Sequence, residues 1–310
     1  MPERNVIDRP PARFRGPVSP PDAARRPSIR RPWRLLLAGW PALLLGGCDV
    51  LRLGVANHAG PVAEAQWHLL LIVGAVLVFV AAPVWLLTPL IAWHYRIGKK
   101  GNVYKPKWTF SWPLEGLIWI PPAGIVIGLG FVLWHYTLAL DPYRPLPSAE
   151  PALEIQAVAL DWKWLFLYPE QGIASVNRMA IPVGRPVHMS LTSGTVMQSL
   201  LIPQLAGQIY AMAGMTTQLN LAASRTGSFR GENTQFNGLG FQNQKFEVLA
   251  QTPEDFGAWV ARARAADRPL DAAAVDGLMK KSVPPEPILY SSAPPDLFQT
   301  LIARAQEPSR

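Results

Sequence analysis

Residues 116–140 read GLIWIPPAGIVIGLGFVLWHYTLAL, a stretch of 25 residues that contains no Asp, Glu, Lys or Arg. As an α-helix this stretch would be about 37 Å long, which exceeds the ~30 Å hydrocarbon layer of a membrane. A second stretch, from Trp67 to Tyr95, also lacks these charged residues and is long enough to cross a bilayer. We therefore predict a membrane protein with a hairpin of two transmembrane helices, over residues 67–95 and 115–140.

The segment between the two predicted helices, residues 96–114, carries five basic residues and no acidic residue. Loops rich in Lys and Arg remain on the cytoplasmic side of a membrane. We therefore expect a cytoplasmic loop at 96–114. Residues 48–66 and everything after residue 140 are then expected on the outer side, which in a bacterium is the periplasmic side of the inner membrane.

The formal net charge of +8 is confined to short segments. Residues 1–34 hold nine Arg against three acidic residues, whereas residues 141–310 hold 14 basic and 15 acidic residues. A protein that binds nucleic acid needs a basic face on a folded domain. Because the largest polar region is nearly neutral, we expect no nucleic-acid partner.

The N-terminal region has the order of a secretory signal: a basic stretch, an apolar run from Leu35 to Leu45, and then small residues. The sequence Leu-Leu-Gly-Gly-Cys at 44–48 resembles a bacterial lipobox, in which the Cys becomes the lipidated first residue of the mature protein. We predict a leader over residues 1–47 and a lipid anchor on Cys48, with membrane lipid as its partner. The alternative is a free or buried thiol after a chance apolar run.

Beyond a Pro-rich linker at 141–152, the outer region contains short alternating runs of apolar and polar residues. Val187, Met189 and Leu191, for example, alternate with polar residues. Such runs, separated by Gly, Pro and Asn, predict an antiparallel β-sandwich over 153–250. Thr252 followed by Pro253 predicts the start of C-terminal helices over 251–282. We expect a loose Pro-rich tail over 283–310.

Three motifs give this architecture a family resemblance: LDWKW at 160–164, VMQSLLIP at 196–203 and QIYAMAGM at 208–215. Together they resemble subunit II of the haem–copper respiratory oxidases, over roughly residues 48–265. The resemblance implies a cupredoxin-like outer domain. In the cytochrome c oxidase branch of that family, the domain binds two copper ions through two Cys, two His, one Met and one Glu carbonyl.

None of those copper ligands is present at the matching positions. In family order, from the upstream His through the ligand loop to the Met, the positions are occupied by Gln198, Asn233, Gln235, Asn237, Phe241 and Gln244. Residues 141–310 also contain no Cys and a single His, His188, which we expect to be an ordinary exposed side chain. A thiolate-bridged copper site cannot be built from these residues, so we expect this chain to bind no metal and no other cofactor.

Loss of the copper ligands indicates the quinol oxidase branch, and the chain resembles subunit II of bo-type ubiquinol oxidases. The resemblance implies that the complex oxidises ubiquinol with oxygen and moves protons outward, and that its haems and copper belong to subunit I. This chain would then be a non-catalytic structural and assembly subunit that contacts subunit I and the other subunits. Cytochrome c is not expected as the electron donor. The alternatives are a cytochrome c oxidase subunit and a lipid-anchored β-sandwich scaffold unrelated to respiration.

One carboxylate and two aromatic residues complete the list of candidates. Glu115 stands at the cytoplasmic start of the second predicted helix, where an ionisable group is a functional candidate. The resemblance associates this place with the entrance of a proton pathway, while the alternative is a carboxylate that stabilises a helix N-terminus at headgroup level. Trp162 and Trp164 match the region beside the copper centre of the other branch, and without a metal we expect both to pack in the core.

Overall fold

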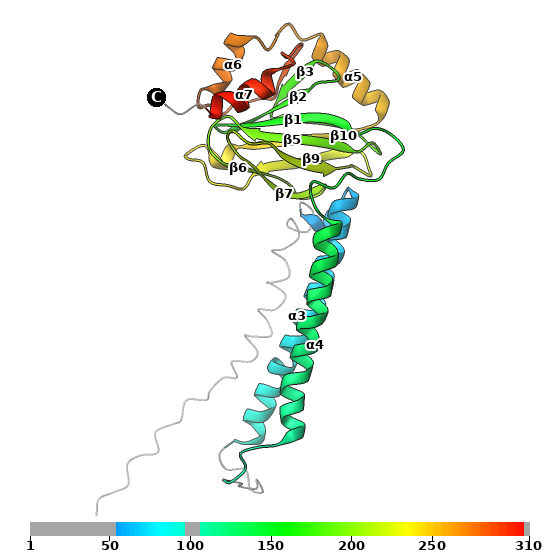
Figure 1. Ribbon diagram of the computed structural model, residues 1–310, viewed down its shortest axis with the longest axis vertical. Helices are drawn as coiled ribbons and strands as arrows, with labels where there is room; N and C mark the ends of the chain where they lie inside the picture. Colours follow the sequence, from blue (N-terminus) through cyan, green and yellow to red (C-terminus); the bar gives the residue numbers. More distant parts are fainter. Residues whose placement is uncertain (1–53, 97–105, 307–310) are drawn as a thin grey trace, which may run out of the picture. The chain divides into compact units, whose positions relative to one another are not determined.

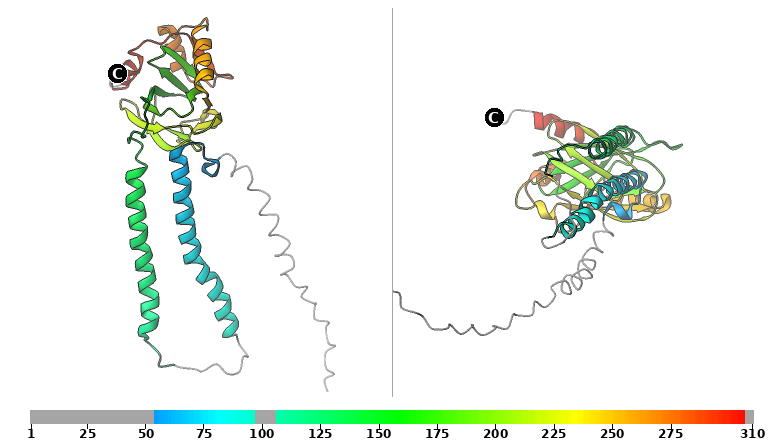
Figure 2. Two further views of the ribbon diagram at one scale, coloured as in Figure 1. Left: turned by 90° about the vertical axis from the view of Figure 1, so that its right-hand side faces the viewer. Right: turned by 90° about the horizontal axis from the view of Figure 1, so that it is seen from below.

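The computed structural model describes residues 54–96 and 106–306 (Figure 1). The predicted leader, Cys48 and most of the basic loop lie outside the described residues. Two helices, α3 (Pro61–His94) and α4 (Trp112–Ala139), are long and apolar enough to cross a membrane. They run next to each other as two continuous helices (Figure 2).

Both helices begin earlier than the charge-free stretches predict. Pro61 occupies the first turn of α3 and Pro113 the first turn of α4, positions where the missing N–H of proline costs nothing. Glu64 and Glu115 therefore lie within the first turns, where a negative charge interacts favourably with the helix dipole. The four internal prolines, two in each helix, are accommodated without ending either helix.

The outer domain contains two β-sheets. The first has the order β11-β3-β2-β1-β5-β8 and the second the order β4-β10-β9-β6-β7. The strands of the first sheet are β1 (Leu153–Leu160), β2 (Lys163–Tyr168), β3 (Ile173–Val176), β5 (Val187–Ser193), β8 (Thr217–Leu221) and β11 (Ile288–Tyr290). Those of the second are β4 (Arg178–Pro182), β6 (Gln198–Ile202), β7 (Ala206–Ala211), β9 (Gly227–Asn233) and β10 (Lys245–Gln251).

The sheets are mixed rather than wholly antiparallel, which corrects one detail of the predicted β-sandwich. β1 pairs with β5 in parallel, and β10 pairs with β4 in parallel. The chain leaves the first sheet after β3, forms β4 in the second sheet, and returns as β5 beside β1. A parallel neighbour requires such a crossover connection, because a tight hairpin can only join antiparallel strands.

The principal core lies between the two sheets and is aromatic. The ring of Phe246 on β10 is 5.8 Å from that of Trp164 and 5.1 Å from that of Phe166, both on β2. Trp259 of α5 (Pro253–Arg264) packs on Tyr168 with ring centroids 5.3 Å apart. As predicted, α5 is capped by Thr252, whose hydroxyl accepts a hydrogen bond from the backbone N–H of Asp255 at 3.2 Å.

Residues 288–306 are folded, so the prediction of a loose Pro-rich tail over 283–310 is wrong for that part of it. β11 extends the first sheet, and α7 (Leu297–Gln306) packs with α6 (Ala272–Met279) on its outer face. This second core buries Val158 and Leu165 against Phe298 and Leu301. Strand β2 is accordingly buried along its whole length, as expected for a strand covered on both faces.

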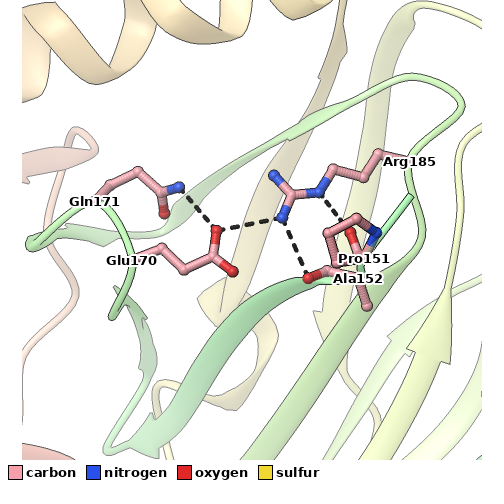
Figure 3. Close-up of polar contacts among 5 residues, drawn as sticks. All are labelled: Pro151, Ala152, Glu170, Gln171 and Arg185. Carbon is pink, nitrogen blue, oxygen red and sulfur yellow. Dashed lines mark hydrogen bonds and ion pairs between the residues drawn. The ribbon is translucent and has the colours of Figure 1, made fainter.

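A single arginine joins the end of the linker to two turns of the outer domain (Figure 3). Arg185 donates through Nε to the carbonyl oxygen of Pro151 at 2.8 Å and through Nη2 to that of Ala152 at 3.2 Å. Its Nη2 also lies 3.2 Å from Glu170 Oε2, and Gln171 donates to the same carboxylate oxygen at 3.4 Å. These contacts fix the start of β1, so residues 151–152 are anchored rather than free linker.

Hydrogen bonds also connect the segment before α3 to the outer domain. Ala59 donates its N–H to the carbonyl oxygen of Gln204 and accepts from the N–H of Ser224, both at 2.7 Å. On the α4 side, the carbonyl oxygen of Pro142 accepts from the backbone and side-chain nitrogens of Asn220, each at 3.0 Å. Both helices therefore leave the membrane region through short connections that are bonded to the sheets.

Candidate functional site

The positions of the missing copper ligands converge at one end of the second sheet. Gln198 begins β6, Asn233 ends β9, and Gln244 lies directly before β10. These three strands are neighbours in the sheet, and Asn237 belongs to the loop that joins β9 to β10. The side chains of Gln198 and Gln244 are fully buried, and that of Asn233 is nearly so.

The four side chains form one hydrogen-bonded group, which we call the amide cluster (Gln198, Asn233, Asn237 and Gln244). Gln244 is its centre: its Oε1 accepts from Asn233 Nδ2 at 3.0 Å and from Asn237 Nδ2 at 2.7 Å. Its Nε2 donates to Gln198 Oε1 and, at 3.1 Å, to the carbonyl oxygen of Leu160. Gln198 Nε2 donates to the same carbonyl at 3.3 Å, so the cluster also binds the end of β1.

The amide cluster does not fit a copper centre. Its members are neutral, and all of their side-chain N–H₂ groups and every side-chain oxygen except Asn237 Oδ1 already bind one another or the backbone. A mixed-valent dinuclear copper site needs soft thiolate ligands, and the outer domain contains no Cys. These hydrogen bonds satisfy most of the buried polar atoms of the cluster, which would otherwise cost stability.

Two of the six positions lie outside the cluster. The ring of Phe241, at the matching position of the second His, contacts the ring of Phe236 with centroids 5.7 Å apart. Gln235, at the position of the Glu, takes part through its backbone: its N–H donates to Asn233 Oδ1 at 3.0 Å, and its carbonyl accepts from Asn233 Nδ2 at 2.8 Å. The Gln235 carbonyl therefore still faces the site, although its partner is an amide.

The two tryptophans beside the cluster behave differently. Trp164 is fully buried in the principal core, which confirms the prediction for that residue. Trp162 is only half-buried and has a left-handed backbone with φ of 67°, so the prediction of core packing is wrong for it. Its indole lies on Gly240, where a Cβ would overlap the ring, and its Nε1 donates to the carbonyl of Asn237 at 3.3 Å. The tight turn between β1 and β2 directs this ring to the loop.

Sequence reasoning missed Lys163, which lies between these tryptophans and is completely buried. Its Nζ donates to three carbonyl oxygens, those of Asp161 at 3.0 Å, Lys280 at 2.9 Å and Ser282 at 3.3 Å. Burial lowers the pKa of the Lys163 ammonium, and the nearby Asp161 carboxylate opposes part of that change. A Lys flanked by two aromatic residues in a buried strand is the signal that could have identified it.

His188 and Glu115 have defined partners. His188 is half-buried rather than exposed, because its Nδ1 lies 3.0 Å from Asn220 Oδ1 on the neighbouring strand β8. Glu115 is half-buried in the first turn of α4, where its Oε2 accepts a hydrogen bond from Trp119 Nε1 at 3.1 Å. This bond connects positions i and i+4 on one face of the helix.

Known proteins are similar to part of the outer domain and to most of the chain. Residues 169–246 match the family described as cytochrome c oxidase subunit II, periplasmic domain. Over 268 residues the chain is 44% identical to the cytochrome bo(3) ubiquinol oxidase subunit 2 of Pseudomonas putida, which covers 86% of this chain and 84% of the relative. The chain belongs to the quinol oxidase subunit 2 family. It is a membrane protein with a periplasmic domain, and it is a subunit of an oxidoreductase complex.

A second relative of this quinol oxidase subunit is the ubiquinol oxidase subunit 2 of Acetobacter aceti, 40% identical over 85% of each chain. Among solved structures, the periplasmic domain of subunit II of cytochrome oxidase from Bradyrhizobium japonicum is similar at 23% identity, with a TM-score of 0.36. It covers 38% of this chain and 98% of that domain. Membership of the quinol oxidase family excludes the alternative of a scaffold unrelated to respiration.

Proposed function

We propose that this chain is the non-catalytic subunit II of a terminal oxidase that oxidises ubiquinol with O₂, forming ubiquinone and water, and that moves protons outward. Its partners are oxidase subunit I, which would hold the haems and the copper, and the other oxidase subunits. The observation that carries the proposal is the amide cluster, which occupies four of the six expected copper-ligand positions with side chains bonded to one another. With that site closed to copper, cytochrome c has no acceptor in this subunit.

The test is co-purification of the tagged full-length chain from its membranes in mild detergent. We expect a haem-containing complex that consumes O₂ with ubiquinol as donor and does not oxidise reduced cytochrome c. Purified complex without haem, or one that oxidises cytochrome c at a comparable rate, would contradict the proposal. The copper content of the complex should be accounted for by subunit I alone.

For Glu115 we propose a role at the entrance of a proton pathway shared with subunit I. Its carboxylate lies in the first turn of a membrane helix and has Trp119 as its hydrogen-bond donor, so it is oriented rather than freely solvated. Glu115→Gln should lower the turnover of the assembled oxidase several-fold and leave the yield of the complex unchanged. The matched control is Glu64→Gln, the same substitution in the first turn of α3. Equal turnover in both variants and the wild type would disprove a role of Glu115 in proton uptake.

We also propose that Cys48 carries a lipid anchor and that the mature protein resides in the bacterial inner membrane. The support is the lipobox-like sequence at 44–48, which follows a basic and apolar leader. Intact-mass measurement of the purified chain should show loss of residues 1–47 and addition of a diacylglyceryl group, both absent from Cys48→Ser. A wild-type chain that retains its leader and an unmodified thiol would disprove the anchor.

A further inference from the structure

A small cavity lies where the two membrane helices meet the outer domain. It has a volume of about 250 Å³ and lies between the outer ends of α3 and α4, the residues after α4, and strands β7 and β8. Its helix residues are Val62 and Gln66 of α3 and Ala139 of α4. Because α3 begins at Pro61 and α4 ends at Ala139, the cavity is at the level of the lipid headgroups of the outer leaflet.

An apolar groove of about 640 Å³ lies between the same two helices, deeper in the membrane. On α3 it is lined by Leu69 and Val73, and on α4 its lining extends from Val126 to Thr137. The cavity residues Val62 and Gln66 and the groove residues Leu69 and Val73 are spaced by four, three and four residues, which places them on one face of α3.

The cavity and the groove are therefore adjacent along both helices. Gln66 and Leu69 are three residues apart on α3, which corresponds to about 4.5 Å along the helix, and Thr137 and Leu140 have the same separation across the end of α4. A cavity of mixed polarity with charged groups in its lining, next to a wholly apolar groove, matches a phospholipid with its head in the cavity and an acyl chain in the groove.

The charges at the cavity match a zwitterionic headgroup. Asp141 and Arg144 both line it and are held by a turn in which the N–H of Arg144 donates to the carbonyl oxygen of Asp141 at 3.0 Å. Arg144 uses Nη1 to bind the carbonyl oxygen of Leu138 at 3.3 Å, which leaves other N–H groups of the guanidinium for a phosphate. The Asp141 carboxylate accepts one bond, from the N–H of Tyr143, and retains capacity for an ammonium group.

We propose that the cavity and groove bind one phospholipid of the outer leaflet with an ethanolamine headgroup, its phosphate on Arg144, its ammonium on Asp141 and one acyl chain between α3 and α4. Amide groups of Gln66 and Gln208 in the cavity lining supply further hydrogen bonds to the head and glycerol oxygens. An anionic headgroup would be repelled by Asp141, and a choline headgroup has no N–H to donate.

The experiment uses the full-length chain in nanodiscs of equal parts phosphatidylethanolamine and phosphatidylglycerol with identical acyl chains. After release into mild detergent, native mass spectrometry counts the lipids retained by each chain. We expect one retained phosphatidylethanolamine, about tenfold less in Arg144→Gln, and a shift of preference to phosphatidylglycerol in Asp141→Asn. Arg262→Gln, an exposed substitution on α5, should behave as the wild type. Equal retention of both lipids in the wild type would overturn the proposal.

Occupancy of the groove by an acyl chain is tested by substituting two glycines of α4 at which a Cβ meets no atom within 4 Å. Gly130 lines the groove and Gly128 does not, so Gly130→Leu should expel the lipid while Gly128→Leu retains it, with unchanged thermal midpoints in both. Equal retention in the two variants would disprove occupancy of the groove. A free lipid retained by Cys48→Ser but not by the wild type would also overturn the proposal, since the chain's own covalent anchor would then occupy the site.

Discussion

At the scale of single residues, Gln244 is the side chain on which the amide cluster depends. It is fully buried and bonds to three other amide side chains and to the end of β1. Gln244→Leu keeps a similar volume and leaves several buried donors and acceptors without partners, each of which costs about 1–3 kcal/mol. We expect the free energy of unfolding of the full chain to fall by about 3 kcal/mol, measured by guanidinium denaturation followed by tryptophan fluorescence.

The control for that substitution is Gln242→Leu, because Gln242 is exposed in the short helix before Gln244. This change should alter stability by less than about 0.5 kcal/mol. Equally small effects of the two substitutions would show that the amide cluster contributes little to stability.

Lys163 gives a second residue-scale prediction, which concerns pH. Its folded-state pKa is lowered by burial from the ordinary value of 10.5, so between the two values the unfolded chain binds more protons than the folded chain. Stability from this group therefore rises with pH across that window. In denaturation at pH 7, 8.5 and 9.5, the free energy of unfolding of the wild type should rise with pH relative to that of Lys163→Met. The exposed control Lys281→Met should follow the wild type, and parallel curves for wild type and Lys163→Met would contradict the expectation.

At the scale of elements, Lys163 also attaches the end of α6 to β2 through the carbonyl oxygens of Lys280 and Ser282. Lys163→Met removes both bonds, so the segment after α6 should open more often. We expect amide hydrogen exchange at Lys280, whose N–H donates to the carbonyl oxygen of Gly277 at 3.3 Å, to accelerate at least tenfold, with little change in β6 or β9. Unchanged exchange would mean that packing alone holds the segment.

Helix α7 provides an independent test of the folded tail. Phe298 is 2% exposed and packs in the second core against the outer face of the first sheet. Phe298→Ala should destabilise the chain by about 3–5 kcal/mol, because it removes a large buried ring and leaves a cavity. Gln299→Ala, on the exposed side of the same helix, should have almost no effect in the same denaturation measurement. If Phe298→Ala lowered the free energy of unfolding only slightly, α7 would be attached loosely to the rest of the domain.

The elements that sequence alone predicted are those with a strong local signal. Two charge-free stretches predicted the membrane helices, and alternation predicted the β-sandwich. The parallel pairing of β1 with β5 has no local signal, since it depends on where the chain goes between them. α7 was missed because the prolines before it suggested an irregular tail, although Leu297, Phe298, Leu301 and Ile302 form one apolar face. The resemblance gave the positions of the amide cluster, but its hydrogen bonds depend on three strands that are distant in the chain.

At the scale of the whole molecule, the connection between membrane helix and outer domain depends on Gly60. Its backbone is extended, with φ of −150°, so any residue could adopt it, but a Cβ there would overlap the carbonyl oxygen of Ala222. Gly60→Ala must therefore displace the start of α3 and weaken the bonds that Ala59 makes to Gln204 and Ser224. We expect a lower thermal midpoint of the full chain and a several-fold lower yield of assembled oxidase, measured by co-purification of haem.

The same substitution elsewhere in α3 separates this effect from helix propensity. A Cβ at Gly74 meets no atom within 4 Å, and alanine favours a helix over glycine by up to about 1 kcal/mol. Gly74→Ala should therefore leave the thermal midpoint unchanged or raise it slightly. If Gly60→Ala also assembled at the wild-type level, the close contact between α3 and the sheets would be dispensable, and the outer domain would be positioned by its partner subunits. Loss of assembly in Gly60→Ala alone would instead mean that this subunit sets the position of its own domain before it meets them.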